Sequence, residues 1–184
     1  MTGWIILGVV VLAALWAISI YNGLVRRKNL VQEGWSGIDV QLKRRADLIP
    51  NLVEAVKGYA AHERGTFDEL TKLRSQTGTQ DVAQRAQTEA AITAAIGKVM
   101  AVAENYPELK ASANFQQLQG DLNNIEDQIQ LARRYYNGTV RDYNVAIQQF
   151  PSSLIAGVGG FIAQPFFQID NAADRDVPKV SFGA

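Results

Sequence analysis

The sequence predicts an all-α protein: an N-terminal transmembrane helix followed by an elongated, antiparallel up-and-down bundle of three to four long helices. Three observations favour this class. An uncharged apolar run comes first, apolar residues then recur every three or four positions, and proline or turn residues separate these repeats. A chain of 184 residues is long enough for one anchor and one modest domain. We divide it into an anchor (1–21), a helical domain (22–150) and a short, irregular, apolar C-terminal segment (151–184).

Composition excludes several classes of function. The 18 basic and 18 acidic side chains cancel, so no overall field attracts nucleic acid. Cysteine is absent, which excludes disulfides, thiolate metal sites and a cysteine nucleophile. The single histidine, His62, excludes a multi-histidine metal site within one chain. We therefore expect no cofactor, no metal, no nucleic-acid partner and no small-molecule substrate.

Residues 4–20, WIILGVVVLAALWAISI, contain no charge and form the predicted membrane anchor. No basic residue precedes the run and no A-x-A pattern ends it, so a retained anchor is favoured over a cleaved signal peptide. Lys and Arg follow the anchor, which predicts an outside N-terminus and a cytoplasmic bulk, with a periplasmic bulk as the alternative. The residues expected at the membrane interfaces are Trp4, Trp16, Tyr21, Arg26, Arg27 and Lys28.

The stretch from Lys43 to Glu63 resembles a site at first, since it combines a block of cations, a proline and the histidine. The apolar residues nevertheless keep helical phase from Val31 to Leu70, across Pro50. A first helix kinked or broken near Pro50, yet roughly collinear, is therefore favoured over a reversal there. The first clear turn is expected at residues 76–79, with Thr79 as the next N-cap.

Two charged residues before the proline receive structural roles. Asp47 is predicted to cap a new helical turn. Arg45 falls on the apolar stripe, so we expect it to be partly buried and to pair with a carboxylate such as Asp47, Glu54 or Glu126.

Two further helices follow. An alanine-rich helix is predicted over residues 82–103 and ends before Pro107. The last long helix carries a heptad seam and ends before Pro151. Because Tyr136 and Tyr143 lie on the seam, we expect an interhelical polar layer in which each hydroxyl has a partner. The seam comprises Phe115, Leu118, Leu122, Ile125, Ile129, Ala132, Tyr136, Val140, Tyr143, Ile147 and Phe150.

Several long motifs occur in the order found in one family. RRADLIPNLVEAVKGYAAHE, YPELKASANFQQLQGDL and ARRYYNGTVRDYNVAIQQFPSSLIA resemble the LemA family. The resemblance covers nearly the whole chain. It implies a bacterial single-pass protein of the inner membrane, with a helical-bundle domain and no established enzymatic activity. Because the family lacks an agreed catalytic motif, the resemblance implies no catalytic residue.

Three hypotheses for function follow. The first is a non-enzymatic scaffold or adaptor that assembles with itself or with other membrane proteins. The alternative is a membrane-surface or membrane-remodelling protein that uses the C-terminal segment, and a hydrolase using His62 or acidic residues is a remote third. With a straight helix at Pro50, the C-terminal segment is expected far from the membrane, and its end, 177–182, is expected to be extended. The structural or interface candidates are Arg45, Asp47, Pro50, Asn51, Tyr136, Asn137, Tyr143, Asn144, Phe150, Phe161, Phe166 and Phe167.

Overall fold

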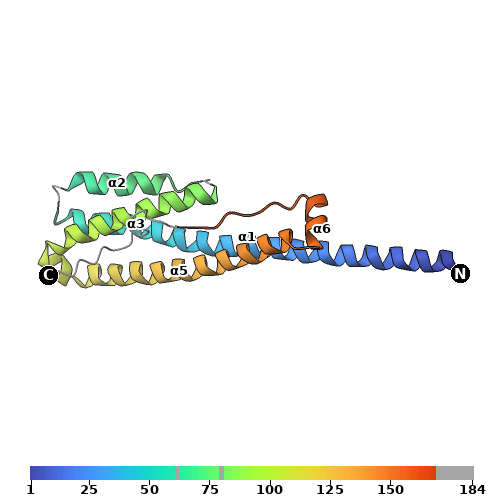
Figure 1. The fold of residues 1–184 in the computed structure, drawn as a ribbon. Helices are drawn as coiled ribbons and strands as arrows, with labels where there is room; N and C mark the ends of the chain where they lie inside the picture. The colour runs from blue at the N-terminus through green and yellow to red at the C-terminus, as the bar shows by residue number, and fades with distance from the viewer. Residues whose placement is uncertain (61–62, 79–80, 169–184) are drawn as a thin grey trace, which may run out of the picture. The chain divides into compact units, whose positions relative to one another are not determined.

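The computed structural model describes residues 1–60, 63–78 and 81–168, and these ranges form helices without any strand (Figure 1). The all-α class is therefore confirmed. Three helices are longer than the others, with 56, 23 and 36 residues. The helices are α1 (Thr2–Lys57), α2 (Arg64–Ser75), α3 (Val82–Glu104), α4 (Pro107–Ala111), α5 (Ala113–Gln148) and α6 (Ser152–Val158).

The contacts divide the chain into two compact units. The first unit contains residues 1–41 and 128–166, and the second contains residues 42–127 and 167–184. Both α1 and α5 contribute to each unit. The division into anchor, helical domain and C-terminal segment stays a prediction.

Helix α1 continues through Pro50, so the first helix is neither broken nor reversed at that residue. The chain turns after Lys57 instead, beginning at Gly58, a residue type with low helix propensity. Helix α2 then runs back along α1, since Arg74 Nε donates to the carbonyl of Ala46 at 2.8 Å. The expectation that residues 76–79 form the first turn was therefore wrong.

The second unit packs α2, α3 and α4 with the adjoining parts of α1 and α5. Helices α2 and α3 are antiparallel, since Glu69 pairs with Lys98 while Arg85, near the start of α3, donates to the carbonyl of Thr77, just after α2. Helix α3 begins after Asp81, whose Oδ1 accepts a hydrogen bond from Gln84 N at 2.8 Å; the predicted N-cap, Thr79, lies outside the described residues. The unit's core contains Ile49, Leu52, Val56, Ala60, Phe67, Leu70, Ile92, Ala95, Val99, Ala103, Leu109, Phe115, Leu118 and Leu122.

In the first unit, α1 and α5 approach closely at Gly34. A Cβ added to Gly34 would lie 3.1 Å from the Cα of Tyr136, and the Trp35 and Tyr136 rings are 5.7 Å apart. The absence of a side chain at Gly34 therefore permits this packing. Most of the predicted α5 seam is buried as far as Tyr143, while Ile125 and Ala132 are half-buried. Phe150 is 81% exposed and lies beyond the end of α5 at Gln148.

The C-terminal segment contains the short helix α6, although an irregular segment was predicted there from the sequence. Its position also differs from the expectation. The Phe161 ring contacts Tyr21, with 5.4 Å between ring centroids, so the segment lies beside the end of the apolar run of α1. The expectation that it would lie far from the anchor was wrong, because α5 returns antiparallel to α1. The predicted extended end, 177–182, lies outside the described residues.

Candidate functional site: a buried ion network and a tethered segment

Arg45 of α1 is the centre of a buried ion network in the second unit. It is 2% exposed, and its guanidinium binds carboxylates on two other helices. Its Nη2 lies 2.6 Å from Glu89 Oε2 on α3, and its Nη1 lies 2.8 Å from Glu126 Oε2 on α5. Nη1 also donates to Thr93 Oγ1 at 2.8 Å. One guanidinium therefore links three helices.

Glu89 joins a second arginine to this network. Its Oε1 lies 2.8 Å from Arg85 Nε, one helical turn earlier in α3. Glu89 is only 1% exposed and Arg85 only 6% exposed. Arg85 Nη1 in turn donates to the carbonyl of Thr77, at the end of α2. The network thus extends from α1 and α5 through α3 to the α2–α3 connection.

The charges of the network balance one another. Two arginines and two glutamates give no formal net charge, and each of these carboxylates is paired with a guanidinium. Removing one partner from such a buried set would leave an uncompensated charge. A cavity of about 230 Å³ lies beside the network, where Met100 and Asn123 join Arg45 and Glu126 in its lining.

Part of this site was predicted from the sequence. Arg45 is buried and pairs with Glu126, one of its three expected partners. Asp47 is exposed inside the unbroken α1, so its predicted capping role was wrong. Glu89 was missed. It lies three residues before Ile92, in phase with the apolar stripe of α3, and this position could have indicated from the sequence that Glu89 is buried.

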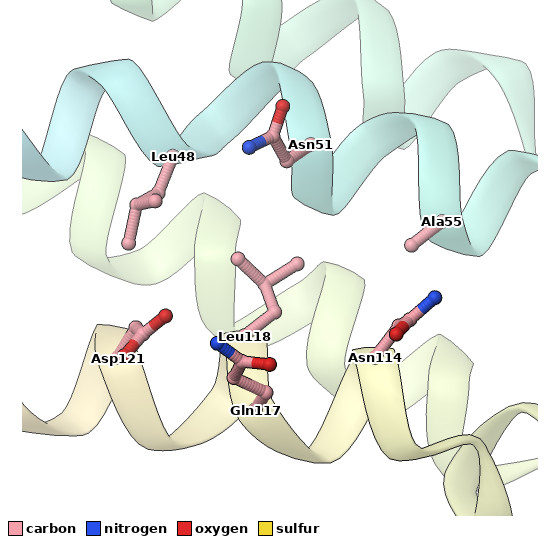
Figure 2. Close-up of a pocket in the computed structure, with 7 residues that line it drawn as sticks. All are labelled: Leu48, Asn51, Ala55, Asn114, Gln117, Leu118 and Asp121. Carbon is pink, nitrogen blue, oxygen red and sulfur yellow. The ribbon is translucent and has the colours of Figure 1, made fainter.

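Asn51 lines a groove of mixed polar and apolar residues between α1 and α5 in the second unit. The cavity measures about 300 Å³. Figure 2 shows Asn51 of α1 facing Gln117 and Leu118 of α5. Leu48 and Asp121 lie at one end of the groove, while Ala55 and Asn114 lie at the other. This order confirms that the two helices are antiparallel here.

A second group of candidates tethers the C-terminal segment to α5 in the first unit. Tyr136 Oη donates to the carbonyl of Pro165 at 2.9 Å, and Tyr143 Oη donates to that of Ile162 at 3.0 Å. Asn144 makes a paired contact, since its Nδ2 donates to Gln164 O and its Oδ1 accepts from Gln164 N, both at 2.9 Å. The segment is therefore bound along about two turns of α5.

The hydrogen bonds of Tyr136 and Tyr143 differ from the interhelical polar layer that the sequence predicted. Both hydroxyls have partners, as expected, but these are backbone carbonyls of a non-helical segment and not side chains of another helix. Non-helical backbone leaves its carbonyls free to accept. Among the other candidates, Asn137 is half-buried, Phe167 is buried and Phe166 is 43% exposed.

Alkaline pH is expected to release the tether at Tyr136. Burial raises the pKa of this phenol from 10.0 to about 12. The folded protein therefore holds the proton more strongly, so the contact is fully stable below pH 10.0 and weakens as the pH approaches about 12. Burial also raises the pKa of Tyr143, so a titration followed by tyrosinate absorbance should show a late step that Tyr136→Phe reduces. A late step of undiminished amplitude in the variant would contradict the assignment.

The anchor candidates lie on the N-terminal part of α1. One helix in the described residues, α1, has an 18-residue window that is long and apolar enough to cross a membrane, and none of that window is buried. Trp4, Trp16 and Tyr21 are exposed along it. The cations that follow, Arg26–Lys28, are also exposed.

The described residues contain no group of three or more His, Asp or Glu side chains that could hold a metal ion. His62, the histidine of the hydrolase hypothesis, lies outside them. The fold therefore provides no test of that hypothesis.

Comparison with known proteins gives consistent matches. A model described as the LemA family matches residues 34–182. The Magnetosome protein MamQ 1 of Paramagnetospirillum magneticum is 26% identical, over 85% of this chain and 68% of that protein. The Magnetosome protein MamQ of Magnetospirillum gryphiswaldense is 24% identical over the same shares. Protein LemA of Metamycoplasma hominis is 29% identical, over 73% of this chain and 63% of that protein.

Proposed function

Because this chain belongs to the LemA family, we propose that it is a non-enzymatic, single-pass membrane scaffold or adaptor. It assembles with further copies of itself or with other membrane proteins. Neither "Magnetosome protein MamQ" nor "Protein LemA" names a reaction, which agrees with a non-enzymatic role.

The main support for this proposal is that α1 is one continuous helix. One helix of 56 residues contains both the unburied apolar window and Ile49, Leu52 and Val56 of the second unit's core. The same helix therefore belongs to the anchor and to the helical domain. A protein bound to the helical domain would be tethered to the membrane through α1.

The buried ion network supports a structural role for the domain. Its charges pair with one another, and its central residues, Arg45 and Glu89, are almost inaccessible to a substrate. A catalytic group needs to reach a reacting atom. The network instead fixes the arrangement of α1, α3 and α5 on which a partner would dock.

We place the protein in the bacterial inner membrane. The exposed cations Arg26, Arg27 and Lys28, just after the apolar window, support an outside N-terminus and a cytoplasmic bulk. A periplasmic bulk is the alternative. A role at the lipid surface has its own support, since Phe161 contacts Tyr21 at the end of the apolar run.

Crosslinking of the full-length protein in isolated native membranes tests the scaffold. We expect discrete crosslinked dimers or larger species at the natural protein level. Ala13 and Ala17 are small residues one helical turn apart in the anchor, where a second anchor can approach closely. Ala17→Ile should therefore reduce self-crosslinking, whereas Val9→Ile serves as the matched anchor control. A protein that stays monomeric and uncrosslinked would contradict the proposal.

A further inference from the structure

The segment around α6 exposes apolar side chains at regular intervals of four residues. Phe150 is 81% exposed, Leu154 63%, Val158 93% and Ile162 71%. No charged residue occurs between Tyr143 and Gln168. Soluble surfaces seldom expose so much apolar area without a charge, and such areas mark contacts with proteins or membranes.

The structure places this segment at a defined position along the anchor. The Phe161 ring meets the Tyr21 ring edge-on at 5.4 Å, directly after the apolar run of residues 4–20. The hydrogen bonds of Tyr136, Tyr143 and Asn144 hold Ile162, Gln164 and Pro165 against α5. The segment is therefore fixed next to the residue where α1 is expected to leave the bilayer.

The direction of α6 suits a membrane surface. Figure 1 shows α6 running across the direction of α1 and not along it. If the apolar run of α1 crosses the bilayer, a helix across it lies in the plane of the interface, as surface-bound amphipathic helices do. The exposed Arg26, Arg27 and Lys28 lie one to two turns beyond Tyr21, at about the depth of anionic headgroups.

We propose that α6 is a lipid-contact site that inserts Leu154 and Val158, together with Phe150 and Ile162, into the interface beside the anchor. The occupant is lipid, and not a second protein, because the exposed apolar surface is adjacent to the apolar run that itself faces lipid. The site adds a second membrane attachment, at α6, to the one provided by α1. The inference rests on the membrane anchoring that the proposed function assumes.

Site-directed spin labelling of the full chain tests the site directly, because the natural sequence contains no cysteine. Single-cysteine variants Leu154→Cys and Val158→Cys would be labelled and reconstituted in vesicles of phosphatidylcholine and phosphatidylglycerol. Accessibility to oxygen and to a water-soluble nickel chelate would then be measured. Val40→Cys, on an exposed position of α1 well beyond Tyr21, is the water control, and Leu12→Cys is the bilayer control.

We expect labels at 154 and 158 to show oxygen accessibility near that at 12 and nickel accessibility several-fold lower than that at 40. Labels as accessible to nickel as the one at 40, with a bilayer signal retained at 12, would overturn the lipid-contact site and leave the anchor intact. Labels shielded from both reagents would also overturn it, since they would indicate a protein contact. A nickel-accessible label at 12 would contradict the anchor itself.

Discussion

Replacing Glu89 by glutamine is expected to lower the free energy of unfolding by about 3–5 kcal/mol. Glutamine keeps the size of the side chain but removes the charge that Arg45 and Arg85 share at 2.6 Å and 2.8 Å. Both guanidiniums are less than a tenth exposed, so neither can recover the loss by turning to water. Denaturant unfolding of the full chain in mild detergent, followed by circular dichroism, measures the change.

An exposed ion pair provides the matched control. Glu69 and Lys98 are 2.9 Å apart, only slightly farther than the buried pairs, but their side chains are 47% and 57% exposed. Glu69→Gln is therefore expected to cost about 0–1 kcal/mol. Equal effects of Glu69→Gln and Glu89→Gln would show that the network contributes no more than a surface pair.

An apolar replacement separates two contributions to the effect of Glu89→Gln: the loss of the ion pairs themselves and the cost of an uncompensated buried charge. Arg45→Met, Arg85→Met and Glu89→Leu together remove the buried charges and keep only Glu126, whose side chain is 37% exposed. Such replacements of buried ion clusters are often neutral or stabilising. We expect the triple variant to regain most of the stability that Glu89→Gln loses, because the main cost of the single change is one buried positive charge in excess of the carboxylates.

The sequence predicted the features that depend on local periodicity. The helical stripe placed Arg45, Tyr136 and Tyr143 in buried positions, and all three are 2% exposed or less. Their partners were harder to predict, because Glu89, Pro165 and Ile162 meet them only through the tertiary arrangement. The turn after Lys57 was missed for a related reason. The apolar phase continues from Val56 to Phe67, and periodicity alone does not register a reversal between them.

Pro50 is tolerated inside a continuous helix because a neighbouring helix supplies the hydrogen-bond donor that proline lacks. Proline has no N–H, so the carbonyl of Ala46, four residues earlier, has no intrahelical donor. Arg74 of α2 occupies this acceptor, with its Nε donating at 2.8 Å. Pro50 therefore weakens α1 and also leaves open the Ala46 carbonyl to which α2 binds.

Replacing Pro50 by alanine is expected to raise the free energy of unfolding by up to about 3 kcal/mol, the difference between the two residues in a helix interior. Pro50 is exposed, so the change removes little packing. The restored N–H would also donate to the Ala46 carbonyl. Denaturant unfolding under the conditions used for Glu89→Gln measures the gain, and a loss of stability would contradict this account of α1.

The attachment of α2 predicts coupling between Pro50 and Arg74. In the natural sequence, Arg74→Met should lower the free energy of unfolding by about 1.5 kcal/mol. The change removes a hydrogen bond from a charged donor and leaves the half-buried carbonyl of Ala46 without that donor. In the Pro50→Ala background the helix itself satisfies that carbonyl, so Arg74→Met should cost less. A double-mutant cycle measures the difference, for which interacting residues typically give about 0.5–3 kcal/mol. Strict additivity would show that Arg74 binds α1 independently of the acceptor that Pro50 leaves open.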